Sequence, residues 1–361
     1  MLKRYLIREI LSNFLVALFI VLFLLFLTRI IDFGPELFQK GGTFSDLVSF
    51  SGYLLFFLLP FALPLAALTG TLLAFMRLAH DQEILAFSAL GVSPRKLLIP
   101  VIYFSLVIFL IVLVLNLVFL PVAKRHMRDT LFEVFKRRLE KGLPEKTPVD
   151  WFPGLLLYAH KVKKGFHFKD FYLFEESGNQ KVGFVYAEKG ELRIKRGEIE
   201  LRLKKGEGHF LSKDLSEAEN FYFGTYIYRI PMERMIKKRK FKRGELNLGA
   251  LLKKARDPKL PLRKRRKYLA EFYQRLFYPF SALILPLLGL PLGARLRASG
   301  RGLALAAGLL LYLLYYLLFS FGTTLAEGGK LPPFLALAWP NLFFLGLALF
   351  LFRDFEKREG R

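Results

Sequence analysis

The chain has 361 residues, of which 53% are hydrophobic and 39 are phenylalanine, and its formal net charge is +25. This composition is typical of a membrane protein that carries a polar domain. The chain has no cysteine, which excludes disulfides, thiolate nucleophiles and cysteine-ligated metals.

Six apolar segments are each long enough to cross about 30 Å of hydrocarbon. They cover residues 10–31, 51–76, 97–122, 272–292, 303–325 and 333–352. The first follows Lys3, Arg4 and Arg8, but it is too long for the core of a signal peptide and no small-residue cleavage site follows it. We therefore expect a retained span.

A short helix, residues 81–91, is predicted between the second and third spans. Asp81 is the expected N-cap, and Gly91 supplies the left-handed residue that ends the helix. Ser93 is expected to cap the next helix, with Pro94 at its first position. At about 13 Å, the short helix cannot cross a bilayer and should lie at the surface.

The central region, residues 124–268, is polar and predicted to be β-rich. Residues 155–162, 169–176, 181–192, 197–205 and 218–230 have strand composition, and turn signals at 177–179, 196–197 and 206–208 separate them. Several short strands at this spacing suggest an antiparallel sandwich or jelly roll. Helices are expected at 125–141 and 246–267, on either side.

The charge of this region points to a phosphate-bearing partner. Residues 124–268 hold 38 Lys and Arg against 19 Asp and Glu, a net charge of +19. Anionic lipid headgroups or a phosphorylated glycolipid fit such a surface. Nucleic acid is not expected, because no nucleic-acid motif occurs and the region is tethered between spans.

Orientation is less clear from charge. With the amino terminus inside, the short inner segments carry 13 Lys and Arg, against Lys40 and Lys330 in the outer loops. The basic flanks 124–138 and 253–267 argue for the opposite orientation. Long domains translocate largely regardless of charge, so we favour an outside domain.

Three groups of motifs resemble the lipopolysaccharide export permeases of the LptF/LptG family. They lie at 59–70 with 77–83 and 89–91, at 271–275 with Pro279, 288–293 and 299–301, and at 329–333 with 339–341. The arrangement of three spans, a β domain and three spans extends the resemblance over the whole chain. The motifs leave open whether the chain is an F-type or a G-type subunit, although the residues from Arg4 to Glu9 favour the F-type.

The resemblance implies a multi-pass bacterial inner-membrane protein without an ATPase site. Two six-span permease subunits would enclose a cavity, and a cytoplasmic LptB-like ATPase dimer would drive them. They would extract lipopolysaccharide from the membrane and pass it to LptC/LptA-like periplasmic β-jelly-roll proteins. The implied domains are 1–123 with a cytoplasmic coupling helix at 81–91, a periplasmic β-jelly-roll-like domain at 124–268, and 269–361 with a cytoplasmic tail.

Within the short helix, Glu83 matches the acidic residue of the family's coupling helix. Glu83, Phe87 and Leu90 share one helical face, which suits insertion into a groove of the ATPase. The predicted coupling set is Arg77, Asp81, Glu83, Phe87, Leu90 and Gly91. The alternative is an ordinary interfacial helix in which Glu83 complements the helix dipole.

Arg29, Lys40 and Arg275 are the predicted lipopolysaccharide-binding residues. Arg29 lies near the outer end of the first span, where the family carries a basic residue, and its planar fork suits phosphate. The alternative for Arg29 is a snorkelling side chain or an ion pair with Asp32.

Enzymatic motifs were not found. The sequence lacks a phosphate-binding loop, a His-Glu-x-x-His motif and a Gly-x-Ser-x-Gly motif, and its five histidines are scattered. We therefore expect no cofactor and no metal. A secondary transporter, a glycolipid-modifying enzyme and a structural anchor remain as alternatives; co-purification with an ATPase would separate them.

Overall fold

The structure is a computed structural model that describes residues 2–39, 42–141, 144–152, 154–163, 166–177, 181–195, 198–212, 218–231, 243–297 and 300–359. The chain forms two compact units. Met1–Leu131 and Phe241–Arg361 form a helical unit, and Phe132–Lys240 form a β unit.

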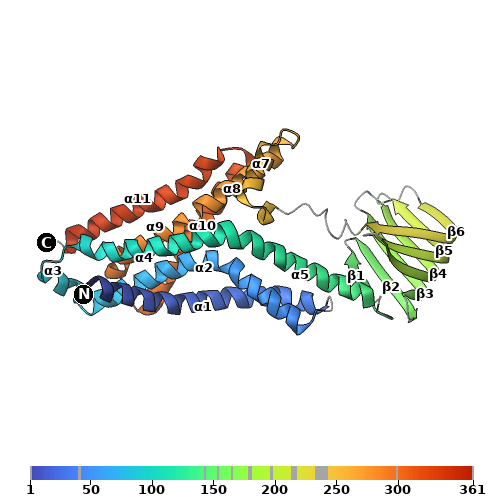
Figure 1. The fold of residues 1–361 in the computed structure, drawn as a ribbon, viewed down its shortest axis with the longest axis horizontal. Helices are drawn as coiled ribbons and strands as arrows, with labels where there is room; N and C mark the ends of the chain where they lie inside the picture. Colours follow the sequence, from blue (N-terminus) through green and yellow to red (C-terminus); the bar gives the residue numbers. More distant parts are fainter. Residues whose placement is uncertain are drawn as a thin grey trace. The chain divides into compact units, whose positions relative to one another are not determined.

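The helices and helical turns follow in chain order (Figure 1). They are α1 (Leu2–Gln39), α2 (Phe44–His80), α3 (Glu83–Ala89), α4 (Pro94–Val114), the π-helical turn η1 (Leu115–Phe119), α5 (Leu120–Lys141), the 3-10 turn η2 (Arg243–Glu245), α7 (Leu248–Arg256), α8 (Leu262–Phe277), α9 (Phe280–Arg295), α10 (Arg301–Gly328) and α11 (Pro333–Glu359). The helix predicted at 246–267 is thus two helices, α7 and the start of α8, with Pro261 preceding the second.

Five stretches of the described chain are long and apolar enough to cross a membrane: α1, α2, α4 continuing through η1 and α5, α10 and α11. Helices α8 and α9 make a sixth if they count as one span, bent by 42°. This confirms membrane helices at five of the six predicted spans, and the span predicted at 272–292 is divided between α8 and α9.

Helix α2 forms the centre of the helical unit and packs against α1 and α9. Small residues allow these backbones to approach closely. A Cβ atom at Gly70 would lie 2.6 Å from Cα of Phe14 on α1, and one at Gly293 on α9 would lie 2.4 Å from the Leu72 carbonyl oxygen. Both glycines are therefore required by helix contact rather than by backbone conformation.

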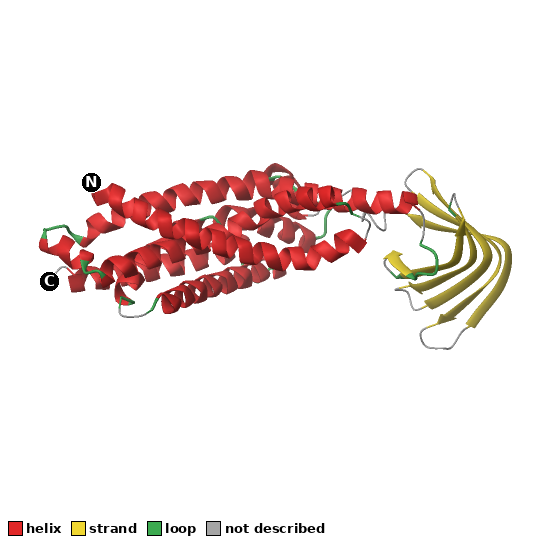
Figure 2. Ribbon diagram, turned by 90° about the horizontal axis from the view of Figure 1, so that it is seen from below, coloured by secondary structure: helices red, strands yellow, loops and turns green. Residues whose placement is uncertain are grey.

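The β unit contains one six-stranded antiparallel sheet. Its strands are β1 (Val149–Phe152), β2 (Leu155–Lys163), β3 (His167–Ser177), β4 (Lys181–Lys195), β5 (Glu198–Ser212) and β6 (Ala218–Pro231). Each strand pairs with the next along the chain, in the order β1-β2-β3-β4-β5-β6. Figure 2 shows that the sheet is strongly curved.

The class predicted from sequence, membrane helices with an antiparallel β domain, is confirmed. The connectivity is simpler than the expected sandwich or jelly roll, because the described strands form a single meander. Alternating residues on one face make its core, namely Leu157, Ala159, Phe171, Leu173, Val185, Ala187, Leu201 and Leu203.

One predicted turn is wrong. Residues 206–208 lie inside β5, with Gly206 opposite Phe223 and Gly208 opposite Phe221 on β6. A Cβ atom at Gly208 would lie 2.3 Å from the Phe221 ring. These glycines leave room for aromatic rings of the neighbouring strand, so they mark close approach within a strand. The turns predicted at 177–179 and 196–197 fall mostly outside the described residues.

The compact units do not divide at the predicted positions 123/124 and 268/269. Residues 124–131 and the chain from 243 onwards belong with the spans. Arg125 on α5 illustrates this, because its Nε donates to the Glu245 carbonyl at 2.7 Å.

Candidate functional site

The short helix α3 lies between the end of α2 and the start of α4, at the end of the helical unit that carries the N-terminus (Figure 1). It ends in a Schellman motif. The Val92 N–H donates to the Phe87 carbonyl at 2.9 Å and the Gly91 N–H to the Ser88 carbonyl at 3.0 Å, with Gly91 at φ +77°. This confirms the left-handed role predicted for Gly91.

The predicted N-cap is wrong. Asp81 is the C-cap of α2, and Gln82, in the left-handed region at φ 58°, precedes α3 without a side-chain capping bond. Asp81 is instead held by Arg77 and His80, at 3.3 and 3.2 Å. Hydrogen bonds from His80 and Arg77 lower the pKa of the Asp81 carboxyl. At the start of α4, Pro94 occupies the first position as predicted, while Ser93 makes no side-chain cap.

Arg77, near the end of α2, joins three carboxylates. Its guanidinium lies 2.6 Å from Glu9 on α1, 3.3 Å from Asp81 and 3.8 Å from Glu83 on α3. The Arg77 side chain is 44% exposed. One arginine thus links α1, α2 and α3.

Glu83 is held a second time. The Tyr5 hydroxyl on α1 lies 2.9 and 2.7 Å from the two Glu83 carboxylate oxygens, to which it donates. Glu83 is therefore tied to the first helix by Tyr5 and pairs more loosely, at 3.8 Å, with Arg77 of the second. We call Tyr5, Glu9, Arg77, Asp81 and Glu83 the α3 network.

The apolar residues of α3 point to two sides. Ile84 is buried, and Phe87 packs with it against the core of the spans. Leu85 and Leu90 are 59% and 79% exposed. The large exposed apolar side chains are thus Leu85 and Leu90. Phe87, predicted to share a face with Glu83 and Leu90, instead packs against the core of the spans.

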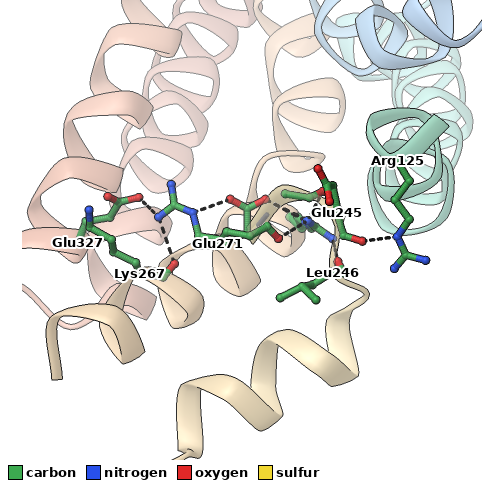
Figure 3. Close-up of polar contacts among 9 residues, drawn as sticks. Arg125, Glu245, Leu246, Lys267, Glu271 and Glu327 are labelled. Atoms are coloured by element: carbon green, nitrogen blue, oxygen red, sulfur yellow. Dashed lines mark hydrogen bonds and ion pairs between the residues drawn. The ribbon is translucent and has the colours of Figure 1, made fainter. Parts of the chain in front are cut away.

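A second polar cluster joins α5, η2, α8 and α10 (Figure 3). Arg275 on α8 is only 2% exposed, and it donates to the carbonyls of Leu246 at 2.6 Å and Gly244 at 2.9 Å. It also pairs with Glu271, one helical turn earlier, at 3.1 Å.

Arg243 extends this cluster to α10, and Glu245 extends it to α5. Arg243 pairs with Glu271 at 3.4 Å and with Glu327 on α10. The carboxylate of Glu245 is buried and pairs with Arg128 on α5. We call Arg128, Arg243, Glu245, Glu271, Arg275 and Glu327 the Arg275 cluster.

The residues predicted to contact lipopolysaccharide differ in their surroundings. The donors of Arg275 are engaged within the chain, so its geometry does not support a direct phosphate contact, and its role is to hold residues 243–246. Arg29 is half-exposed on α1 and lies 3.8 Å from Asp32, a loose pair. Lys40 lies outside the described residues.

Sequence reasoning missed several members of both sites. Tyr5 and Glu9 lie one turn apart on α1 and could have been grouped as one face. Arg243 and Glu327 are separated by 84 residues, and nothing in the sequence pairs them. Among the described residues, no group of three or more His, Asp or Glu could hold a metal ion.

Residues 4–354 match the family described as lipopolysaccharide export system permease LptF/LptG. The chain is 25% identical to lipopolysaccharide export system permease protein LptF of Escherichia coli K12, over 96% of this chain and 93% of that protein. An uncharacterized Rickettsia prowazekii protein is 21% identical over 80% of each chain.

Proposed function

We propose a mechanical role for α3 from the premise that the chain belongs to the LptF/LptG family of lipopolysaccharide export permeases. As a member it is a multi-pass inner-membrane protein and a transport subunit. In the proposal, a separate cytoplasmic ATPase dimer of the LptB type grips α3, and its ATP-driven closure moves the spans.

The observation that carries this proposal is the double attachment of Glu83. Because Tyr5 holds Glu83 to α1 and Arg77 pairs with it more loosely from α2, a force applied to α3 reaches both helices. Leu85 and Leu90 present apolar side chains that a groove on the partner would cover. The α3 network is thus both a docking surface and a joint.

The cargo is extracted into a cavity shared with a second permease subunit. From there lipopolysaccharide passes along the β unit to periplasmic LptC/LptA-like β-jelly-roll proteins. The curved sheet suits this role because strands at its edge can add a strand of a partner protein. The proposal places the β unit in the periplasm and α3 in the cytoplasm.

Orientation can be tested directly because the chain has no natural cysteine. Leu90→Cys should resist a membrane-impermeant thiol reagent applied to intact inner-membrane spheroplasts and react after permeabilisation. Labelling of Leu90→Cys in intact spheroplasts would overturn the scheme.

Docking is tested by Glu83→Arg. This substitution reverses the charge at α3 while the apolar spans stay unchanged, so the ATPase should no longer co-purify with a tagged chain. Glu133→Arg, an equal charge change at an exposed position of α5, is the matched control and should retain the ATPase. Full co-purification with Glu83→Arg would refute the docking role.

We also propose that Arg29, with Lys40, contacts a phosphate of the lipopolysaccharide. Arg29 is half-exposed and its pair with Asp32 is loose, so its fork remains accessible. Arg29→Glu should reduce photo-crosslinking of lipopolysaccharide to the cavity, and unchanged crosslinking would remove Arg29 from the site.

A further inference from the structure

A polar pocket of about 270 Å³ lies inside the helical unit, beside the Arg275 cluster. Helices α2, α5, α8 and α10 and the turn η1 contribute to its walls. Its polar lining includes Asn116, Lys124, Glu271, Arg275, Thr323 and Glu327. Its volume is below the roughly 300–1,000 Å³ that enclose a whole drug-sized ligand, so it suits a headgroup.

The pocket lies where the apolar runs end. Lys124 follows the apolar residues 97–122, Glu327 follows 303–325, and Glu271 precedes 272–292. The ends of apolar runs coincide with the boundary of the hydrocarbon, where lipid headgroups lie. A group bound here would be at the level of the lipid phosphates.

Charge within the pocket leaves one cation unmatched. Glu271 is paired with Arg275 and Arg243, and Glu327 is paired with Arg243. In the described part of the chain no carboxylate forms an ion pair with Lys124, whose ammonium lies 5.7 Å from the centre of the Phe57 ring. Lys124 and Arg275 in the lining, together with Arg243 beside it, give three cations against the two carboxylates Glu271 and Glu327, a net charge of +1.

Asn116 supplies a second unmatched group. This residue is 5% exposed, and no hydrogen bond joins its side-chain amide to another described residue. It lies on the π-helical turn η1, and such turns occur frequently at functional sites. Most buried amides have a hydrogen-bond partner, and the Asn116 amide faces the pocket, so it can donate to a group bound there.

We propose that this pocket binds the monoanionic phosphodiester headgroup of one membrane phospholipid, with Lys124 as the charge partner of the phosphate and Asn116 as a second donor. A phosphodiester carries the single negative charge that the pocket lacks, and its oxygens accept from ammonium and amide groups. The acyl chains extend from the pocket along the spans. This lipid is distinct from the transported glycolipid and stabilises the junction of α5, α8 and α10.

The test uses the purified full chain with its co-purifying partners, delipidated in detergent and examined by native mass spectrometry. Phosphatidylglycerol should bind in preference to phosphatidylethanolamine, whose headgroup has no net charge. Lys124→Gln should weaken phosphatidylglycerol binding about tenfold or more, as expected for loss of a charge-assisted hydrogen bond. Lys124→Arg should retain most of it.

Two further variants separate charge from folding. Lys330→Gln removes the same charge from an exposed position outside the pocket and should bind phosphatidylglycerol like the unaltered chain. Thr323→Leu fills the pocket without changing its charge and should also weaken binding. Unfolding temperatures measured without lipid identify any variant that has lost its fold.

Several results would overturn the proposal. Equal binding to Lys124→Gln and Lys330→Gln would show that the pocket is not the site. Equal binding of phosphatidylethanolamine would refute the charge argument, and saturation by water-soluble glycerophosphoglycerol would indicate a small-anion site. Competition by lipopolysaccharide at the same concentration would assign the pocket to the cargo. None of these outcomes bears on ATPase docking, which the Glu83 variants test separately.

Discussion

The α3 network and the Arg275 cluster both connect several helices through arginine and glutamate, but they differ in burial. Arg77 and Glu83 have side chains that are 44% and 28% exposed, whereas those of Arg275 and Glu271 are 2% and 11% exposed. Exposed ion pairs contribute about 0–1 kcal/mol, whereas breaking a buried pair costs about 3–5 kcal/mol. We therefore expect the contacts of the α3 network to break at lower cost than those of the Arg275 cluster.

The largest effect is expected from Arg275→Met. This change leaves Glu271 without its closest partner and frees the carbonyls of Gly244 and Leu246, so the free energy of unfolding should fall by about 3–5 kcal/mol. Reversible denaturation in detergent, or the unfolding temperature, measures it. Arg29→Met, at a half-exposed position, is the control and should change stability little. An equal loss of unfolding free energy in Arg275→Met and Arg29→Met would show that burial does not separate the two kinds of ion pair.

Tyr5→Phe is expected to have a smaller effect on stability and a clear effect on coupling. It removes a hydroxyl that donates to Glu83, a bond worth about 1 kcal/mol at this partly exposed position. The ATPase should still bind, but transport per ATP hydrolysed should fall, because α3 is then held to α1 only through Arg77. The measurement is lipopolysaccharide release against phosphate release in proteoliposomes. An unchanged ratio would show that Tyr5 does not transmit force.

Arg77→Met should change stability by less than about 1 kcal/mol, although it removes contacts to three carboxylates. High salt should weaken these contacts in the unaltered chain, because half-exposed pairs are screened. Thermal unfolding at low and high salt measures both effects. A loss as large as that of Arg275→Met would show that the α3 network is as rigid as the buried cluster.

The smallest effect concerns pH. Because the pKa of Asp81 is lowered in the folded chain, its ionised form adds stability above the unfolded pKa of about 3.9, and this contribution disappears as pH falls through the folded pKa. The stability difference between the unaltered chain and Asp81→Asn should therefore stay constant from about pH 8 to 5 and shrink below about pH 4. A difference that changes near neutral pH would contradict this assignment.

Local patterns in the sequence succeeded where the structure depends on neighbours along the chain. Runs of strand-forming residues between turn signals located β2 to β6, because strand propensity depends on the residues of the strand itself. The predicted turn at 206–208 failed because Gly206 and Gly208 accommodate Phe223 and Phe221 from another strand. A glycine that permits a turn and one that permits close approach look the same in sequence.

The candidate sites were predicted only in part for the same reason. Arg77, Asp81 and Glu83, which the sequence grouped because they lie within seven residues of one another, do meet in the structure. Asp81 was assigned to the wrong cap, since its carboxylate turns back to Arg77 and His80. Arg275 was expected to face lipid, but the chain at 243–246 covers it and takes its hydrogen bonds.

The sequence by itself determined the spans, the antiparallel strands, the short helix ended by Gly91 and the family, because each depends on residues close together in the chain. The tertiary structure alone decided which polar groups meet: Tyr5 with Glu83, Arg243 with Glu327, and Lys124 with no carboxylate among the described residues. The burial of a charged side chain and its hydrogen-bonding or ion-pair partners decide whether it stabilises the fold, transmits a force or can bind a ligand. Both are set by segments far apart in sequence that pack together only in the folded chain.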